Sequence, residues 1–336
     1  MGYNFSLPRF SELTDNQKLA LEEIGAIALS GGPGSGKTVV SLWRHIRNYE
    51  IGGISSLLLT YTKTLEFYLK HTAAKKNQKA STNISRTKKW TFSACKSHFD
   101  EIIIDEAQDV SIDLYNTINN FADEVSYGAD DAQGVYKDGC SKNDLESLFE
   151  NNEEYELAQN FRNSKEILQF TKAVFPDLSI PHNVLASSSE TGIKPFVQVL
   201  GRYNFEDSAI KNIIEITEEY PEATHNIGIL VPSAKQVDLY QSLLHKKVNC
   251  SKYHSKMPDF ESLERIHITT FKSAKGLEFD SVIIPGFDSY NWFIEKTEGR
   301  FTENDYYVAL TRAKRNLFLL CKFAINIALN TTYNKG

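Results

Sequence analysis

The sequence predicts an α/β protein of two units, each a mostly parallel sheet covered by helices. Short apolar runs alternate with amphipathic stretches through most of the 336 residues, a pattern typical of strands and helices in succession. A glycine-rich turn follows the first apolar run, and two carboxylates follow a later one, which is where α/β sheets bind ligands. The length allows two domains of ordinary size, each with its own core.

The first alternation predicts an N-terminal lobe over residues 1–175. Its strands are short apolar runs, and its helices are longer stretches with apolar side chains at helical spacing. The predicted strands are residues 26–29, 56–60, 101–104, 124–127 and 155–158. The predicted helices are residues 15–24, 38–48, 113–121, 142–149 and 164–174.

The second alternation predicts a C-terminal lobe over residues 190–336. Residues 175–195 lack sustained periodicity and contain prolines and a run of serines, so they are predicted to be a connection. The predicted strands are residues 196–200, 227–231, 265–270, 281–285 and 316–321, and the predicted helices are residues 205–219, 234–244 and 304–313.

The turn at residues 31–38 fits the phosphate-binding pattern of a P-loop, and a strand before it and a helix after it disfavour a chance match. Backbone N–H groups there are expected to face phosphate oxygens, with Lys37 supplying a charge and Thr38 a hydroxyl for Mg²⁺. The residues assigned to the nucleotide are Gly32, Gly34, Ser35, Gly36, Lys37 and Thr38.

Asp105 and Glu106 follow the apolar strand that begins at Glu101. Alone, they would be an ordinary acidic turn. Together with the loop, they predict that Asp105 holds Mg²⁺ and that Glu106 orients or deprotonates the attacking water. The two motifs therefore predict that the chain binds and hydrolyses a nucleoside triphosphate.

The bulk composition does not indicate a nucleic-acid binder, because the net charge is −6 and 24% of residues are charged. The interval between Glu66 and Asp100, however, contains no acidic residue. Its cations are Lys70, Lys75, Lys76, Lys79, Arg86, Lys88, Lys89 and Lys96. Two readings stay open: a solvated loop, or a surface that contacts a phosphate backbone with Trp90 and Phe92 as stacking platforms.

The four cysteines are widely separated and form no metal-ligand spacing, which suits a reducing cytosol. No apolar run reaches the length that spans a membrane. A cytoplasmic location without a membrane partner is therefore expected.

From Gln17 to Arg312, motifs in a fixed order resemble those of the superfamily 1 helicase motors of the UvrD/Rep/PcrA type. Asp-Glu-Ala-Gln-Asp at residues 105–109 is the form of the acidic motif typical of that group, and residues 13–17 resemble its adenine-reading Q motif. The resemblance implies two RecA-like lobes around a nucleotide-binding cleft, with ATP and Mg²⁺ as cofactors. Gln17 would then select adenine.

The resemblance also implies five further contacts to the nucleotide. Gln133 would sense the γ-phosphate, Phe161 would stack on adenine and Arg162 would reach the γ-phosphate. Glu278 would lie near the ribose or phosphates, and Arg312 would be an arginine finger supplied across the cleft.

A third set of positions matches the family's nucleic-acid contacts. These positions are Thr62, Thr91, Phe92, Tyr136, Thr270 and Lys275. The chain departs from the usual pattern at three places: Ser93 and Lys272 replace histidines, and Ala129 replaces a glycine.

Large relatives insert helical domains between these motifs, but the intervals here are too short for an inserted domain of typical size. We therefore predict a minimal ATP-dependent motor that acts on single-stranded DNA, with 3′ to 5′ direction implied by the family and weak unwinding alone. RNA is not excluded. The alternative is an ATPase switch subunit that regulates a partner such as a nuclease in a bacterial defence system, with the acidic stretch 144–156 as a docking face. A small-molecule P-loop kinase would leave the second lobe unexplained.

Overall fold

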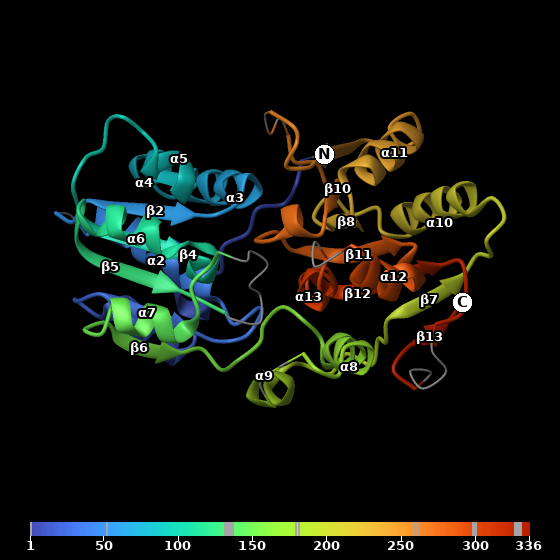
Figure 1. The fold of residues 1–336 in the computed structure, drawn as a ribbon, viewed down its shortest axis with the longest axis horizontal. Coiled ribbons are helices and arrows are strands. Elements are labelled where there is room, and N and C mark those ends of the chain that lie inside the picture. The colour runs from blue at the N-terminus through green and yellow to red at the C-terminus, as the bar shows by residue number, and fades with distance from the viewer. Residues whose placement is uncertain are drawn as a thin grey trace. The chain divides into compact units, whose positions relative to one another are not determined.

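The computed structural model describes residues 2–51, 53–130, 138–178, 180, 182–258, 260, 262–297, 301–325 and 331–336. They divide into two compact units (Figure 1). The N-terminal unit comprises Phe5–Phe161 and Pro181–Ser187, and the C-terminal unit comprises Met1–Asn4, Arg162–Ile180 and Ser188–Gly336.

The N-terminal unit contains a six-stranded sheet in the order β3-β2-β4-β5-β1-β6, and every neighbouring pair is parallel. The strands are β1 (Ile27–Ser30), β2 (Ser56–Thr60), β3 (Ile84–Arg86), β4 (Phe99–Asp105), β5 (Ala122–Gly128) and β6 (Glu153–Glu156). The helices are α1 (Asp15–Glu22), α2 (Lys37–Glu50), α3 (Lys63–Ala74), α4 (Gln78–Thr82), α5 (Thr87–Thr91), α6 (Ile112–Asn119), α7 (Lys142–Leu148) and α9 (His182–Ser187). Short 3₁₀ turns are η1 (Phe10–Glu12) and η2 (Ala107–Asp109).

Both faces of this sheet are covered, because side chains on successive strand residues point to opposite sides. On β4, Ile103 packs in one buried cluster with residues of α1 to α4, whereas Ile102 and Ile104 pack in another with residues of α5 to α7. A strand buried on both faces has a continuous apolar sequence. This explains why the sequence predicts β2 and β4.

The C-terminal unit contains a seven-stranded sheet in the order β13-β7-β12-β11-β8-β10-β9, again with parallel neighbours throughout. The strands are β7 (Phe196–Val199), β8 (Ile227–Val231), β9 (Cys250–Tyr253), β10 (Ile266–Thr270), β11 (Phe279–Pro285), β12 (Ala313–Cys321) and β13 (Asn334–Lys335). The helices are α8 (Lys165–Val174), α10 (Phe205–Glu219), α11 (Ala234–Leu244), α12 (Tyr290–Lys296) and α13 (Glu303–Leu310). Short 3₁₀ turns are η4 (Lys272–Ala274) and η5 (Phe287–Ser289).

The predicted α/β class with two mostly parallel sheets is confirmed. The bounds of β2, β8, α10 and α11 are those that the sequence predicts. Elements that the sequence did not predict are β9, α12 and β13 in the C-terminal unit, and α3, α4, β3 and α5, which lie in the basic stretch. That stretch is therefore ordered secondary structure, and its reading as a solvated loop is wrong.

The division between the units differs from the predicted end of the first lobe at residue 175, because Arg162–Ile180 groups with the C-terminal unit. Helix α8 anchors this segment: its Phe170 is fully buried and packs against Phe287 and Tyr333, with ring centroids 6.0 and 6.2 Å away. The predicted connection 175–195 also contains α9.

Among the described residues, no helix has the length and apolar character needed to cross a membrane.

Candidate active site

The phosphate-binding loop joins the end of β1 to the start of α2 in the N-terminal unit. Gly34 and Gly36 have φ values of 71° and 94°, in the left-handed region that other residues rarely adopt. A Cβ at Gly36 would lie 2.4 Å from Nε2 of Gln17, and one at Gly32 would lie 2.5 Å from a methyl group of Val184. The glycines therefore allow both the turn and the close approach of its neighbours.

Lys37 begins α2 and turns its ammonium back over this loop. Its Nζ donates to the carbonyls of Gly31 (2.6 Å) and Gly32 (3.0 Å) and lies 3.6 Å from Oδ2 of Asp130. A nearly buried cation thus stands at the positive end of a 14-residue helix. Charge and helix end together favour an anion at this loop.

Asp105 is the last residue of β4 and is buried beside Thr38, whose side chain forms a hydrogen bond with it. Burial and the charge of Glu106 raise the pKa of the Asp105 carboxyl. In the described part of the chain, its Oδ2 has no hydrogen-bond partner. A buried carboxylate oxygen without a donor, next to a hydroxyl and an anion site, fits a hard cation such as Mg²⁺.

Glu106 has φ of 60°, which is uncommon for a residue with a side chain. Its Oε2 accepts a hydrogen bond from Nε2 of Gln108 at 2.6 Å, and Oε1 of Gln108 accepts one from the backbone N–H of Asp130 at 3.1 Å. The buried Tyr115 hydroxyl donates to the carbonyl of Ala107 and fixes the intervening turn. Strained backbone held by several contacts is characteristic of functional sites.

Gln108 was missed as a site residue by sequence reasoning. It is buried and connects the Glu106 carboxylate to Asp130, which lies directly before residues outside the described part. Its position in the acidic motif, two residues after Glu106, is the sequence feature that could have identified it as a site residue.

Gln17 and Phe161, both assigned to adenine, meet the same loop. Gln17 Oε1 accepts from the backbone N–H of Thr14, and Nε2 donates to the carbonyl of Ser35, both at 3.0 Å. An amide has two donors and two acceptor positions, so one of each remains for a base. The backbone N–H of Phe161 donates to the carbonyl of Gly34 at 2.9 Å, and 54% of Phe161 is exposed.

In the C-terminal unit, Arg162 and Glu278 form an ion pair. Nε of Arg162 lies 2.7 Å from Oε1 of Glu278, and Lys314 Nζ lies 3.3 Å from the other carboxylate oxygen. The neighbouring Asn163 donates to the carbonyls of Thr311 (3.0 Å) and Ala313 (2.7 Å). Three sequence motifs that are far apart in the chain thus converge in this unit.

Arg312 lies beside that cluster but is buried. Its Nε donates to the carbonyl of Val308 at 3.0 Å, and one terminal nitrogen donates to the carbonyl of Leu277 at 3.4 Å. The guanidinium therefore contacts backbone of its own unit, and its predicted role as an arginine finger remains a prediction.

The predicted nucleic-acid contacts have unlike environments. Thr62 caps α3, and Thr270 accepts from the backbone N–H of Ser273 at the start of η4. Thr91 is buried and its hydroxyl donates to the carbonyl of Thr87, whereas 77% of Phe92 is exposed. Lys275 is fully buried. Gln133 and Tyr136 lie outside the described residues.

Replacing Glu278 with Gln should flatten the acid dependence of stability in the C-terminal unit. Burial opposes ionisation of Glu278, but Arg162, Lys314 and Arg312 outweigh it and lower the pKa to about 2 from the ordinary 4.5. A depressed pKa contributes stability above the unfolded-state value that is lost as the pH falls toward 2. The stability difference between wild type and variant should therefore shrink across this range.

The measurement is a set of urea unfolding curves between pH 7 and pH 2 in a Trp43→Phe, Trp90→Phe background, where the fluorescence of Trp292 reports on the C-terminal unit. Glu218→Gln, at an exposed position of α10, is the matched control and should show no such convergence. A wild-type to Glu278→Gln difference that stays constant over the range would contradict the assignment.

Comparisons with known proteins give one family match. Residues 248–322 match the UvrD-like helicase C-terminal domain. A protein of Acanthamoeba polyphaga mimivirus that bears the name of an ATP-dependent DNA helicase, R568, is 25% identical over 248 residues. That alignment covers 67% of this chain and 34% of the viral protein, so the chain spans about a third of the relative's length.

Several solved structures align over most of the chain. S. cerevisiae Dbp5 bound to RNA and ADP BeF3 has a TM-score of 0.57 at 11% identity, covering 97% of this chain and 90% of Dbp5. Arterivirus nonstructural protein 10 (helicase) has a TM-score of 0.44 at 15% identity, covering 94% of this chain and 63% of that protein. The likeness to Dbp5 supports the fold alone.

Proposed function

The chain is related to the superfamily 1 helicases of the UvrD type, and we propose that it is a minimal motor that hydrolyses Mg²⁺-ATP on single-stranded DNA. One observation carries the proposal: the buried Lys37 and Asp105 and the partly buried Thr38 share one site, and Glu106 follows Asp105 directly. Enzymes with many different activities contain a phosphate loop. The carboxylate of Glu106, held beside the proposed Mg²⁺ site at Thr38 and Asp105, favours hydrolysis among these activities.

The residues of the N-terminal unit have distinct proposed roles. Lys37 and the loop N–H groups bind the phosphates, and Thr38 with Asp105 would hold Mg²⁺, which neutralises charge on the phosphates when bound. Glu106, oriented by Gln108, accepts a proton from the attacking water. Gln17 and Phe161 would contact adenine.

In the C-terminal unit, Arg162 and Arg312 are proposed to stabilise charge on the transferred phosphoryl group. Arg162 would have to exchange Glu278 for a phosphate oxygen, and Arg312 would have to leave the carbonyls of Val308 and Leu277. Both movements would make catalysis dependent on a conformational change, as expected of a motor.

Single-stranded DNA should stimulate steady-state ATP turnover severalfold, because strand binding and nucleotide hydrolysis are coupled in a motor. The assay compares single-stranded DNA, duplex DNA and RNA at matched nucleotide concentration. Displacement of streptavidin from biotin at either strand end then tests the 3′ to 5′ direction. Turnover indifferent to every nucleic acid would contradict the proposal.

A second candidate, an ATPase subunit that regulates a partner such as a nuclease of a bacterial defence system, is supported by the chain between β2 and β4. Residues 61–98 are all described and hold only α3, α4, β3 and α5, which belong to the N-terminal unit. That interval leaves no separate domain to confront a duplex. A partner that co-purifies in stoichiometric amount and changes the ATPase rate would favour this candidate.

A further inference from the structure

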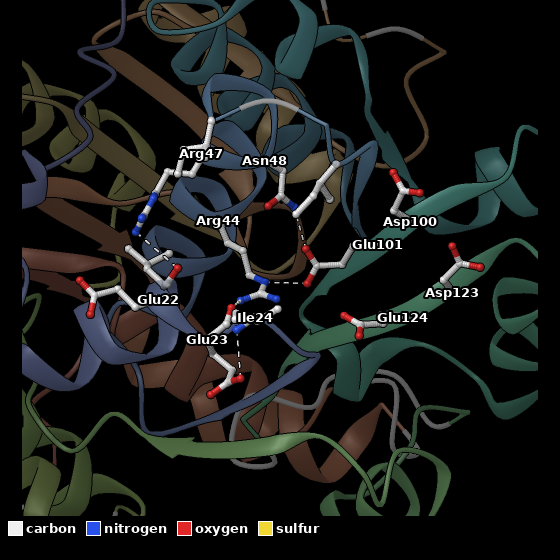
Figure 2. Close-up of a pocket in the computed structure, with 13 residues that line it drawn as sticks. Glu22, Glu23, Ile24, Arg44, Arg47, Asn48, Asp100, Glu101, Asp123 and Glu124 are labelled. Carbon is white, nitrogen blue, oxygen red and sulfur yellow. Dashed lines mark hydrogen bonds and ion pairs between the residues drawn. The ribbon is translucent and has the colours of Figure 1, made fainter.

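The N-terminal unit has a pocket at the edge of its sheet opposite the phosphate loop. The pocket has a volume of about 510 Å³ and lies where β4 and β5 begin and where α1 and α2 end (Figure 2). Since parallel strands all run the same way, this amino edge is separated from the carboxyl edge that carries Asp105.

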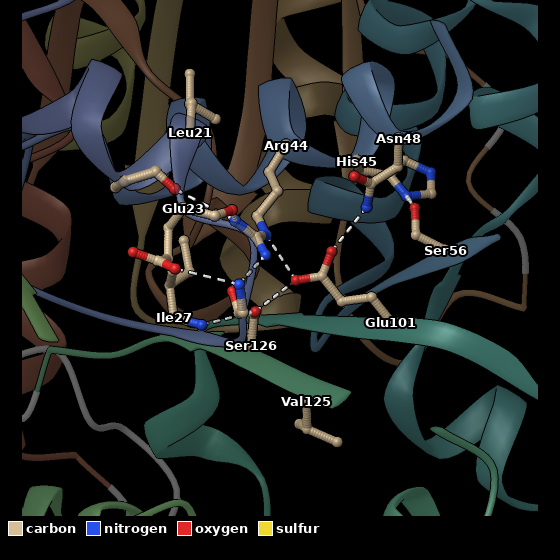
Figure 3. A network of polar contacts seen from close by, with 12 residues as sticks. Leu21, Glu23, Ile27, Arg44, His45, Asn48, Ser56, Glu101, Val125 and Ser126 are labelled. Atoms are coloured by element: carbon tan, nitrogen blue, oxygen red, sulfur yellow. Dashed lines mark hydrogen bonds and ion pairs between the residues drawn. The ribbon is translucent and has the colours of Figure 1, made fainter. Parts of the chain in front are cut away.

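The floor of the pocket is a buried polar network (Figure 3). Nε of Arg44 lies 2.6 Å from Oε1 of Glu101, which also accepts from the Ser126 hydroxyl, while Asn48 donates to Oε2 at 2.7 Å. Arg44 further donates to the carbonyls of Glu23 (2.9 Å) and Gly25 (2.7 Å). Every group of this network has a partner, so the floor is rigid and Arg44 is neutralised.

The walls are acidic. Besides the Arg44–Glu101 pair, five carboxylates line the pocket against the single guanidinium of Arg47. They are those of Glu22, Glu23, Asp100, Asp123 and Glu124. Glu124 pairs in register with Glu101 on the neighbouring strand, and partial desolvation of this exposed carboxyl, followed by the charge of Glu101, raises the pKa of Glu124. A cation entering the pocket would relieve this repulsion.

The rim is apolar. Ile24, Ile51 and Ile54 line the pocket, and Ile24 and Ile51 are 90% and 73% exposed. Single exposed aliphatic side chains are common on protein surfaces. Three of them around one acidic depression form a patch that offers a partner both negative charge and apolar surface. An occupant with apolar side chains would bury these isoleucines and lower the free energy of binding.

We propose that this pocket docks a basic, partly apolar segment of a partner protein, with an Arg or Lys side chain in the acidic depression and flanking apolar side chains on the three isoleucines. Nucleic acid is disfavoured because its phosphates would meet carboxylates. A divalent ion is disfavoured because the described residues contain no group of three or more His, Cys, Asp or Glu side chains that could hold a metal.

The position of the pocket makes the partner compatible with bound nucleotide. Helix α2 runs from Lys37 at the phosphate loop to Arg44 and Asn48 at the pocket, and β4 runs from Glu101 at the pocket to Asp105. The docked segment would therefore contact the far ends of the two elements that carry the phosphate and metal residues. Docking itself does not depend on the ATPase proposal.

The test is fluorescence anisotropy of the full chain with short labelled peptides that alternate Arg with Leu, Arg with Ser, or Glu with Leu. The Arg-Leu peptide should bind most tightly and the Glu-Leu peptide should not bind. Asp123→Asn with Glu124→Gln should weaken Arg-Leu binding about fivefold or more, as expected for loss of two exposed charge partners. The matched control, Glu150→Gln with Glu218→Gln, removes the same charge elsewhere and should change it less than about twofold.

The apolar rim is tested by Ile24→Ser with Ile51→Ser. This pair should weaken the Arg-Leu peptide about tenfold or more, because two isoleucines lose apolar burial, and should leave the Arg-Ser peptide unchanged. Equal binding of both basic peptides, or equal losses in the acidic and control variants, would overturn the proposal. Sedimentation velocity gives a further outcome: a wild-type dimer that Asp123→Asn with Glu124→Gln converts to monomer would make a second copy the occupant and would also overturn it.

Discussion

Glu106→Gln should lower ATP turnover by about a hundredfold or more, the usual contribution of a general base, and change ATP affinity little. The amide keeps the size of the side chain and can still contact Gln108, but it cannot accept the proton of the attacking water. Lys37 and the loop, which bind the phosphates, are untouched. The measurement is steady-state turnover at saturating ATP with single-stranded DNA, beside binding of a fluorescent ATP analogue.

Two companion variants sharpen this result. Glu150→Gln removes an exposed carboxylate of the same unit and should retain full turnover. Gln108→Leu leaves Glu106 intact but removes the donor at 2.6 Å, so it should lower turnover without abolishing it and leave ATP affinity unchanged. Wild-type turnover in Glu106→Gln would refute the base assignment, whereas wild-type turnover in Gln108→Leu would refute only the positioning role.

The phosphate loop could be predicted because its constraints are local. Gly34 and Gly36 adopt left-handed conformations, and the strand before them and the helix after them are adjacent in the chain. Strands β2 and β8 could also be predicted, because a strand buried on both faces has a continuous apolar sequence. Such features depend on neighbours that the sequence itself places side by side.

Features that depend on residues far apart in the chain could not be predicted from the sequence. Strand β3 has three residues, and its existence depends on pairing with β2, so no periodicity announces it. The ion pair of Arg162 with Glu278 joins positions 116 apart in the sequence. Arg44 and Glu101 look like surface charges of a helix and a strand end, yet both are buried because each satisfies the other.

Glu101→Ala should destabilise the N-terminal unit by about 3–5 kcal/mol, the range for breaking a buried ion pair by removing one partner. Glu101 is only 3% exposed, and its loss would leave the Arg44 guanidinium buried without a counter-charge. Ser126 and Asn48 would lose their acceptor as well. Most single substitutions cost far less.

Fluorescence can isolate this unit, because Trp43 and Trp90 belong to it and Trp292 belongs to the other. In a Trp292→Phe background, urea unfolding should show an earlier transition for Glu101→Ala. Glu124→Gln, at the exposed position paired in register on β5, should stay within about 0.5 kcal/mol of the parent. An unchanged transition for Glu101→Ala would mean that water or rearrangement compensates the guanidinium.

The double variant Arg44→Met with Glu101→Leu separates charge from packing. Apolar replacements of both partners often cost little, so the double variant should be more stable than the sum of the single losses predicts. Recovery should nevertheless be incomplete, because Arg44 also donates to the carbonyls of Glu23 and Gly25 beyond the end of α1. Methionine has no donor for these carbonyls, and buried acceptors without a donor cost free energy. The free energy of unfolding that the double variant does not recover therefore measures what Arg44 contributes through its hydrogen bonds to the end of α1, apart from its ion pair with Glu101.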